Sequence, residues 1–284
     1  MEMNSGPGGL AAHVRAHLPE LRGAEARVAR VVLDQGSDLV HLSISDVAVL
    51  AGTAASSVVR ACQRLGFRGY QELKIAAARQ APVRPATPDA DDADPAARAL
   101  ADTVRSAHEA LDGLAATLPA ERVRQAADLL HTAPRVLVTG AGLSGAVAAD
   151  AAYRLRALGS AVDAPVDPIT AELAAAQLPP GAVCLAISHT GATRSTVDAA
   201  RRARAAGAEV VVLTSYARSP LSDMSTCTLV AGGQDLVFGL ETVASRMAHL
   251  AVVDAVTLTL LALRGPGAER ALNLAADVTA DYAY

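Results

Sequence analysis

The sequence has no tryptophan, and aromatic residues make up only 2% of its 284 residues. Because 51% of the residues are nevertheless hydrophobic, a core must be built from Ala, Val and Leu. Cysteine is also scarce, and Cys62, Cys184 and Cys227 are too far apart for a CxxC pair or a zinc site. We therefore expect reduced, buried cysteines and no metal site.

Long apolar runs are missing as well. Crossing a bilayer takes about 18 to 20 consecutive apolar residues, and the longest candidate, Leu250–Leu263, is shorter and contains Asp254. Residues 1–9 lack the basic patch and apolar stretch of a signal peptide. We therefore expect a cytoplasmic protein without a membrane-spanning segment.

Positive charge is scarce overall but concentrated near the N-terminus. The net charge is −4, yet residues 1–80 hold 9 Arg or Lys against 7 Asp or Glu, whereas residues 81–284 hold 16 against 22. Within residues 54–80 five basic residues accompany one acidic residue, Glu72. This excess suits contact with a phosphate backbone, although a solvated helix face is the ordinary alternative. Lys74 is the only lysine, which excludes a Schiff-base mechanism in the C-terminal part.

A proline-rich stretch divides the chain. Residues 81–95 contain four prolines and four aspartates and lack apolar periodicity, which is typical of an extended acidic linker. The pattern before this stretch is helical, and the pattern after it alternates between strands and helices. The sequence therefore predicts an all-α domain over residues 1–80, a linker over residues 81–95 and an α/β domain over residues 96–284.

The N-terminal part contains two short helical patterns separated by a glycine-containing turn. Ser43 and Asp46 are good capping residues for a helix that continues to Leu50. Residues 51–53 (Ala-Gly-Thr) interrupt this helix, and a second helix is predicted over residues 54–65. Two helices joined in this way form a helix-turn-helix, the arrangement that places its second helix in the major groove of DNA.

The C-terminal part predicts a three-layer α/β domain. After a helical segment over residues 96–118, single helices separate short apolar strands, which implies a parallel sheet covered on both faces. In such a sheet, ligands bind at the carboxyl ends of the strands. The predicted strands are 135–139, 161–163, 182–187, 209–214 and 227–230, and the predicted helices are 143–158, 194–206, 241–263 and 267–283.

The first candidate loop, Gly140-Ala-Gly-Leu-Ser-Gly145, follows a predicted strand and opens a predicted helix. It matches the GxGxxG pattern of dinucleotide-binding turns, and Asp163 lies about 20 residues further on, where an acidic residue would bind a ribose. By itself the loop favours a nicotinamide dinucleotide. Glycines at such a turn also serve plain packing of helix on strand, and that alternative stays open.

The second candidate loop, Ser188-His-Thr-Gly-Ala-Thr193, also lies between a strand and a helix. It offers three hydroxyls, a glycine that permits close approach and the N–H groups of a helix N-terminus, which together suit a phosphate. Ser144 adds a fourth hydroxyl from the neighbouring turn. The pair of loops favours a compact phosphomonoester, whereas the ordinary alternative is that Ser188 and Thr193 only cap the helix.

These two loops resemble a sugar isomerase (SIS) domain. Residues 188–193 resemble the family's Ser-x-Ser-Gly-x-Thr/Ser phosphate motif, with Thr190 in place of the second serine, and residues 140–144 fit its first glycine-serine turn. The resemblance implies an SIS-like fold and a sugar-phosphate site. The residues that it implies for this site are Gly142, Ser144, Ser188, His189, Thr190, Gly191, Thr193 and Glu241.

The N-terminal part resembles the RpiR/MurR family of transcriptional regulators, whose architecture joins a helix-turn-helix to an SIS domain. The resemblance is carried by residues 42–46, 51–52, 58–60 and 64–74. That family usually opens the recognition helix with Ser or Pro; here the helix opens on Ala54, which cannot cap, so we expect Thr53 to cap it. The resemblance implies a regulator that binds double-stranded DNA and senses a phosphorylated sugar.

The first turn of the second helix is expected to meet base edges in the major groove. Arg60 is the best candidate for a guanine contact, while later polar residues suit the phosphate backbone. Because one such helix buries too little surface for specific binding, we predict a homodimer or homotetramer on a pseudo-palindromic operator, assembled through the long apolar helices. The predicted DNA-binding residues are Ser45, Ala55, Ser56, Ser57, Arg60, Arg64, Arg68, Tyr70 and Lys74.

Two other functions stay open. An aldose–ketose phosphate isomerase needs a base beside the substrate carbonyl, and Glu241 or His189 could serve. Their ordinary interpretation is a helix N-terminal charge for Glu241 and a solvent-facing loop position for His189. A nucleotide-binding redox sensor would rest on the GxGxxG loop. The remaining histidines, His249 among them, form no spaced cluster and are interpreted as surface or packing residues. We predict a regulator that is not an enzyme, with no catalytic residue, metal or cofactor.

Overall fold

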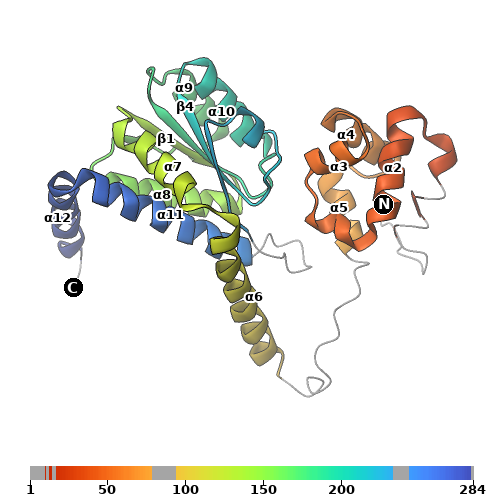
Figure 1. Ribbon diagram of the computed structural model, residues 1–284, viewed down its shortest axis with the longest axis horizontal. Helices are drawn as coiled ribbons and strands as arrows, with labels where there is room; N and C mark the ends of the chain where they lie inside the picture. The colour runs from red at the N-terminus through yellow and green to blue at the C-terminus, as the bar shows by residue number, and fades with distance from the viewer. Residues whose placement is uncertain (1–9, 11–12, 15–16, 79–93, 233–242, 283–284) are drawn as a thin grey trace. The chain divides into compact units, whose positions relative to one another are not determined.

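The computed structural model describes residues 10, 13–14, 17–78, 94–232 and 243–282 (Figure 1). These residues form two compact units, one made of residues up to Val104 and the other beginning at Arg105. The boundary between the units falls within one long helix, α6 (Pro95–Thr117).

The N-terminal unit is helical in the part that the structure describes. Its apolar side chains form one cluster to which every α-helix before residue 79 contributes, and Val28, Val47, Val58 and Leu73 are fully buried in it. The elements are η1 (Leu18–Glu20), α2 (Gly23–Gln35), η2 (Gly36–His41), α3 (Ile44–Leu50), α4 (Ala55–Arg64) and α5 (Tyr70–Ala78).

Helices α3 and α4 form the predicted helix-turn-helix. Ser43 and Asp46 make a reciprocal capping box at the start of α3, and the two helices are bent by 94° at the break between them. The expectation that Thr53 caps α4 is wrong, because the N-cap is Ala54. The backbone N–H of Thr53 instead donates to the carbonyl of Ala48 at 2.8 Å, so Thr53 completes the end of α3.

The C-terminal unit contains a five-stranded parallel sheet with the order β2-β1-β3-β4-β5. The strands lie where the apolar runs predicted them, and β3 is buried along its whole length, as expected for a central strand of a covered parallel sheet. The strands are β1 (Val136–Gly140), β2 (Val162–Asp163), β3 (Val183–Ile187), β4 (Glu209–Thr214) and β5 (Cys227–Val230).

Helices cover both faces of this sheet, which confirms the three-layer α/β architecture (Figure 1). Alternate residues of β1 divide between the two faces: Val136 and Val138 pack with α7, α8 and α11, and Leu137 packs with α9 and α10. The helices are α7 (Ala120–Thr132), α8 (Leu143–Ala157), α9 (Pro168–Ala176), α10 (Arg194–Ala205), α11 (Val243–Arg264) and α12 (Pro266–Ala280).

Helix α11 corrects the expectation about long apolar segments. By length and composition Ser245–Arg264 is long and apolar enough to cross a membrane. Only one face of it is nevertheless packed in the core, and Asp254 on its surface pairs with Arg154 of α8 at 2.8 Å. One face of α11, with residues four apart, is buried against the sheet layer: Ala248, Val252, Val256 and Leu260.

Candidate functional site

The two loops predicted to bind phosphate meet at the carboxyl ends of neighbouring strands of the sheet. From β1 the chain passes to β2 on one side and then returns to β3 on the other, so the topological switch point lies between the carboxyl ends of β1 and β3. Gly140 and Ile187, the last residues of these strands, are paired in register. Residues 141–145 and 188–193 therefore leave the sheet side by side.

A direct hydrogen bond joins the two loops. The backbone N–H of His189 donates to the hydroxyl of Ser144 at 3.2 Å, and both residues are buried. Gly140 is crowded at this contact, since an added Cβ would lie 2.8 Å from the carbonyl oxygen of Ser144. The structure thus brings the turn of Ser144 against the loop that begins at Ser188.

The second loop is tightly folded around Gly191. This residue has φ +62°, and an added Cβ would lie 2.1 Å from the Ser219 hydroxyl oxygen, so a side chain is excluded both by conformation and by space. The hydroxyls of Ser188 and Thr193 lie 3.0 Å apart, and the Thr190 hydroxyl accepts from the N–H of Ala192 at 3.2 Å. Hydrogen bonds within the loop therefore hold these hydroxyls in place.

Two helix N-termini open at this edge. Helix α8 begins after Gly142 and helix α10 begins after Thr193, and within the described residues neither N-cap supplies a side-chain hydrogen bond to its helix. This geometry counts against the alternative that Thr193 only caps α10. Free N–H groups at adjacent helix N-termini favour an anion.

His189 is not the solvent-facing loop residue of the ordinary interpretation, because it is buried and hydrogen-bonded. Its Nδ1 lies 2.9 Å from the hydroxyl of Ser215, which lies 3.1 Å from Nε2 of His249. The His189 ring also meets the ring of Tyr216 edge-on, with centroids 5.6 Å apart. Sequence reasoning missed Ser215 and His249 as parts of this site, since they come from segments far apart in the chain.

Three further predictions concern Glu241, the cysteines and a metal site. Glu241 lies outside the residues that the structure describes. All three cysteines are buried, as expected, and burial raises the pKa of the Cys62 and Cys184 thiols to about 12, so they stay protonated. In the described ranges no group of three His, Cys, Asp or Glu residues is placed to hold a metal ion.

The predicted DNA-reading helix, α4, presents a polar surface. Ser56, Arg60 and Arg64 are exposed, whereas Ser57 is buried on the same side as Val58. The guanidinium of Arg60 donates to the Ser57 hydroxyl at 2.9 Å, three residues back along the helix. Ser57 is therefore placed to orient Arg60, and its burial removes it from the exposed positions that base contact needs.

The remaining residues predicted to contact DNA differ in their exposure. The side chain of Arg68 is 91% exposed, and Glu72 accepts its backbone N–H. Tyr70 instead is buried, and its hydroxyl donates to the carbonyl of Leu42 at 2.9 Å, so it packs the unit together rather than facing outward. Three further predicted contacts are partly exposed: Ser45, Ala55 and Lys74.

Two family models match the chain. The helix-turn-helix domain of the rpiR family matches residues 8–81, and the SIS domain matches residues 129–263. The HTH-type transcriptional regulator HexR of Pseudomonas aeruginosa is 32% identical over 259 residues, which cover 89% of each chain. The chain belongs to the RpiR family of transcriptional regulators. An HTH-type transcriptional regulator of Caldanaerobacter subterraneus subsp. tengcongensis is 30% identical over 233 residues, covering 81% of this chain and 83% of that protein.

Solved structures of other proteins share the fold of this chain. The Vibrio vulnificus NanR protein complexed with ManNAc-6P matches with a TM-score of 0.83 and 25% identity, covering 97% of this chain and 99% of that one. The sugar isomerase domain of an RpiR transcription factor from Sphaerobacter thermophilus matches with a TM-score of 0.54 and 22% identity. It covers 64% of this chain and 98% of that one, which shows a shared fold.

In this RpiR regulator an arginine that sequence reasoning missed holds the turn of the helix-turn-helix. Arg27 of α2 donates from Nε to the carbonyl of Ala51 at 2.8 Å and from a terminal nitrogen to the carbonyl of Gly52 at 3.1 Å. Carbonyls at a helix end lack partners within the helix, and a cation suits them. Nothing in the local pattern pairs residues 24 positions apart, so only the tertiary structure reveals the contact.

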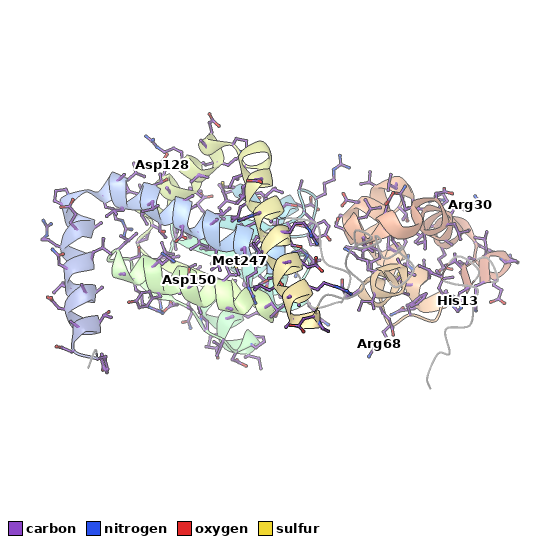
Figure 2. All side chains as sticks on the ribbon, turned by 90° about the horizontal axis from the view of Figure 1, so that it is seen from below. His13, Arg30, Arg68, Asp128, Asp150 and Met247 are labelled. Carbon is purple, nitrogen blue, oxygen red and sulfur yellow. The ribbon has the colours of Figure 1, made fainter. Side chains whose placement is uncertain are left out.

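We expect Arg27→Ala to lower operator affinity by about tenfold, because the turn between α3 and α4 loses two charge-assisted hydrogen bonds. Arg30→Ala is the matched control, because it removes the same charge from the same helix. Arg30, labelled in Figure 2, is exposed, and its side chain makes no hydrogen bond to the described residues. The measurement is fluorescence anisotropy with an operator duplex selected by the wild-type protein from a randomised pool. Equal losses in both variants would mean that Arg27 contributes only its charge.

Proposed function

We propose that residues 96–284 of this regulator bind a phosphorylated sugar at the carboxyl ends of β1 and β3, and that this binding modulates operator binding by residues 1–80. The observation that carries the proposal is the hydrogen bond from the N–H of His189 to the hydroxyl of Ser144, since it joins two phosphate-type loops into one site. The similar NanR protein was solved with ManNAc-6P, which supports a sugar phosphate as the ligand class.

The proposed ligand contacts are the hydroxyls and N–H groups of the two loops. The N–H groups at two helix N-termini without side-chain caps suit the phosphate. The ring of His189 suits a further oxygen atom of the ligand. The proposed set is Gly142, Ser144, Ser188, His189, Thr190, Gly191 and Thr193, with Glu241 as a candidate partner of a sugar hydroxyl.

On the DNA side, we propose that Ser56 and Arg60 meet base edges and that Arg64, Arg68 and Lys74 meet phosphates. Tyr70 is left out because its hydroxyl is committed to backbone carbonyls. Specific affinity requires more surface than one such unit offers, so a homodimer or homotetramer in the cytoplasm would bind a pseudo-palindromic duplex.

The two alternative functions have less support. The dinucleotide interpretation relied on Asp163, but its carboxylate pairs with Arg135 at 2.6 Å rather than standing ready for a ribose. An isomerase would need a base beside the carbonyl; of the two candidates, His189 has its Nδ1 engaged by Ser215, and Glu241 lies outside the described residues. The relatives reported above are named as transcriptional regulators, which agrees with a protein that is not an enzyme.

A thermal-shift screen of the full chain tests the proposed function. We expect a hexose 6-phosphate or pentose 5-phosphate to raise the unfolding temperature, and the same sugar without phosphate to leave it unchanged. A ligand at 100 times its dissociation constant adds about 2.7 kcal/mol to the free energy of unfolding, which such a screen detects. The ligand found should then change the affinity for the selected operator. Stabilisation by NADH alone, or turnover of the sugar phosphate, would contradict the proposal.

A further inference from the structure

Helix α12 is anchored at its base, where it joins α11. The guanidinium of Arg264, just before the corner, donates to the carbonyls of Leu158 and Leu130 at 2.9 and 3.1 Å, which ties the corner to α8 and α7. Gly265 has φ +52° and Pro266 opens α12, so the chain changes direction there. In both views α12 then extends clear of the sheet (Figures 1 and 2).

The outer half of α12 carries an apolar stripe that no described part of the chain covers. Ala268, close to the corner, is the buried residue of this helix, whereas Leu274 and Val278 are 67% and 61% exposed. Tyr282, a further four residues on, is exposed as well. Residues four apart lie on one face of a helix. Because isolated helices shorter than about 12–15 residues are marginal in water, a helix with so little packing gains stability from a partner.

Two charged side chains flank this stripe in a self-complementary order. Arg270 lies one turn before Leu274, and Asp277 lies about one turn after it, on the same face of α12. Both are exposed, and neither forms an ion pair with a described residue. If two copies of α12 pack antiparallel with Leu274 at the two-fold axis, position 270 of one copy meets positions 277 and 278 of the other. Each arginine then lies beside an aspartate of the other copy.

A second exposed apolar stripe, on α9, lacks these features. Ile169 and Leu173 are exposed there, but the other face of α9 packs into the core through residues such as Ala171, so this helix has its own packing. The carboxylate beside the stripe, that of Glu172, already pairs with Arg202 of α10 at 3.4 Å. The stripe of α9 is therefore a suitable comparison surface for that of α12.

We propose that α12 is a dimerisation arm, and that its partner is α12 of a second copy of this chain, packed antiparallel with Leu274 at the two-fold axis. Such a contact is isologous, since the same surface serves both copies. This inference rests on the proposed function, which calls for two DNA-binding units on a pseudo-palindromic operator. It adds the surface that joins them: an apolar stripe centred on Leu274, with two pairs of Arg270 and Asp277 beside it.

Sedimentation of the full chain over a concentration series measures the dissociation constant of the dimer. We expect Leu274→Glu to raise this constant at least about tenfold, because it removes an apolar contact and places two carboxylates against each other at the axis. Ile169→Glu on α9 is the matched control and should leave the constant unchanged. Both side chains are exposed, so circular dichroism should show both variants folded. An unchanged constant for Leu274→Glu would overturn the inference while leaving a dimer built on another surface.

Charge reversal tests the antiparallel register. Arg270→Asp should weaken the dimer about tenfold, since it turns two attractive pairs into repulsive ones, and the double variant Arg270→Asp with Asp277→Arg should restore the wild-type constant. A double variant as weak as Arg270→Asp would overturn the proposed pairing. If the wild type sediments as a monomer even on the selected operator, the homo-oligomer of the proposed function fails together with the arm. Sugar-phosphate sensing is judged separately, by the thermal-shift screen.

Discussion

Replacing Arg60 by alanine is expected to lower affinity for the selected operator by about 30-fold or more and to leave the ligand thermal shift unchanged. Arg60 is exposed on α4, and its guanidinium is drawn toward the first turn of the helix by the Ser57 hydroxyl at 2.9 Å. The first turn is the part of a recognition helix that meets base edges. A bidentate contact between arginine and guanine contributes about 1–3 kcal/mol, and two copies of the helix on a pseudo-palindrome double that contribution.

Titrations at several salt concentrations separate base contact from phosphate contact. Arg60→Ala should reduce the ratio of operator affinity to affinity for unrelated DNA. Arg64→Ala is the control, because Arg64 is exposed in the last turn of the same helix and carries the same charge. It should weaken binding to both duplexes alike and lower the salt dependence by about one phosphate contact. If Arg60→Ala behaved like Arg64→Ala, Arg60 would be a backbone contact.

The strands of the sheet could be predicted from sequence because each is a short apolar run bounded by turn residues. Residues 182–187 predicted β3 within one residue, and residues 209–214 predicted β4 without error. Two helices were missed although their signals are present. Helix α9 begins with Asp167 as N-cap and Pro168 at its first position, and α7 carries buried residues at helical spacing, such as Ala126 and Leu130.

Side-chain orientation in the N-terminal unit was harder to predict than the helices. Ser57 and Tyr70 are polar and lie among basic residues, which favoured an exposed position in the sequence. The structure buries both, because the helical period of α4 turns Ser57 inward next to Val58, and because carbonyls of the η2 region accept the Tyr70 hydroxyl. Residue type predicts the side-chain chemistry, whereas packing decides which direction that chemistry faces.

The two glycine-containing loops could be placed from sequence because strand ends of a parallel sheet share one edge. Their mutual contact and the partners of His189 could not, since Ser215 and His249 lie 26 and 60 residues beyond it and carry no local pattern. The GxGxxG match misled in part: Gly140 is required by close packing on the Ser144 carbonyl, which a dinucleotide site does not explain. Asp163 did not indicate a ribose site, because its carboxylate pairs with Arg135, the residue just before β1.

Replacing Ser188 by alanine is expected to lower affinity for the phosphorylated sugar found in the thermal-shift screen by about tenfold or more and to leave operator affinity of the ligand-free protein unchanged. Ser188 is fully buried at the base of the loop, and its hydroxyl lies 3.0 Å from that of Thr193. The substitution removes one hydroxyl and leaves Thr193 without this partner, so the loop loses both a polar group and its internal bond. A hydrogen bond to a charged oxygen is worth about 1.5–3 kcal/mol.

The control for Ser188→Ala is Thr132→Val, which removes a hydroxyl near the amino end of β1, opposite the carboxyl ends where the two loops lie. Thr132 ends α7 just before β1 begins, and its hydroxyl donates only to carbonyls of its own helix among the residues described. It should change neither ligand nor operator affinity. Isothermal titration and fluorescence anisotropy on the same preparations compare Ser188→Ala with Arg60→Ala. Because a polar loop on the sheet and a basic helix perform separate tasks in the proposed regulator, each variant should lose one property only. Loss of both properties in both variants would contradict that separation.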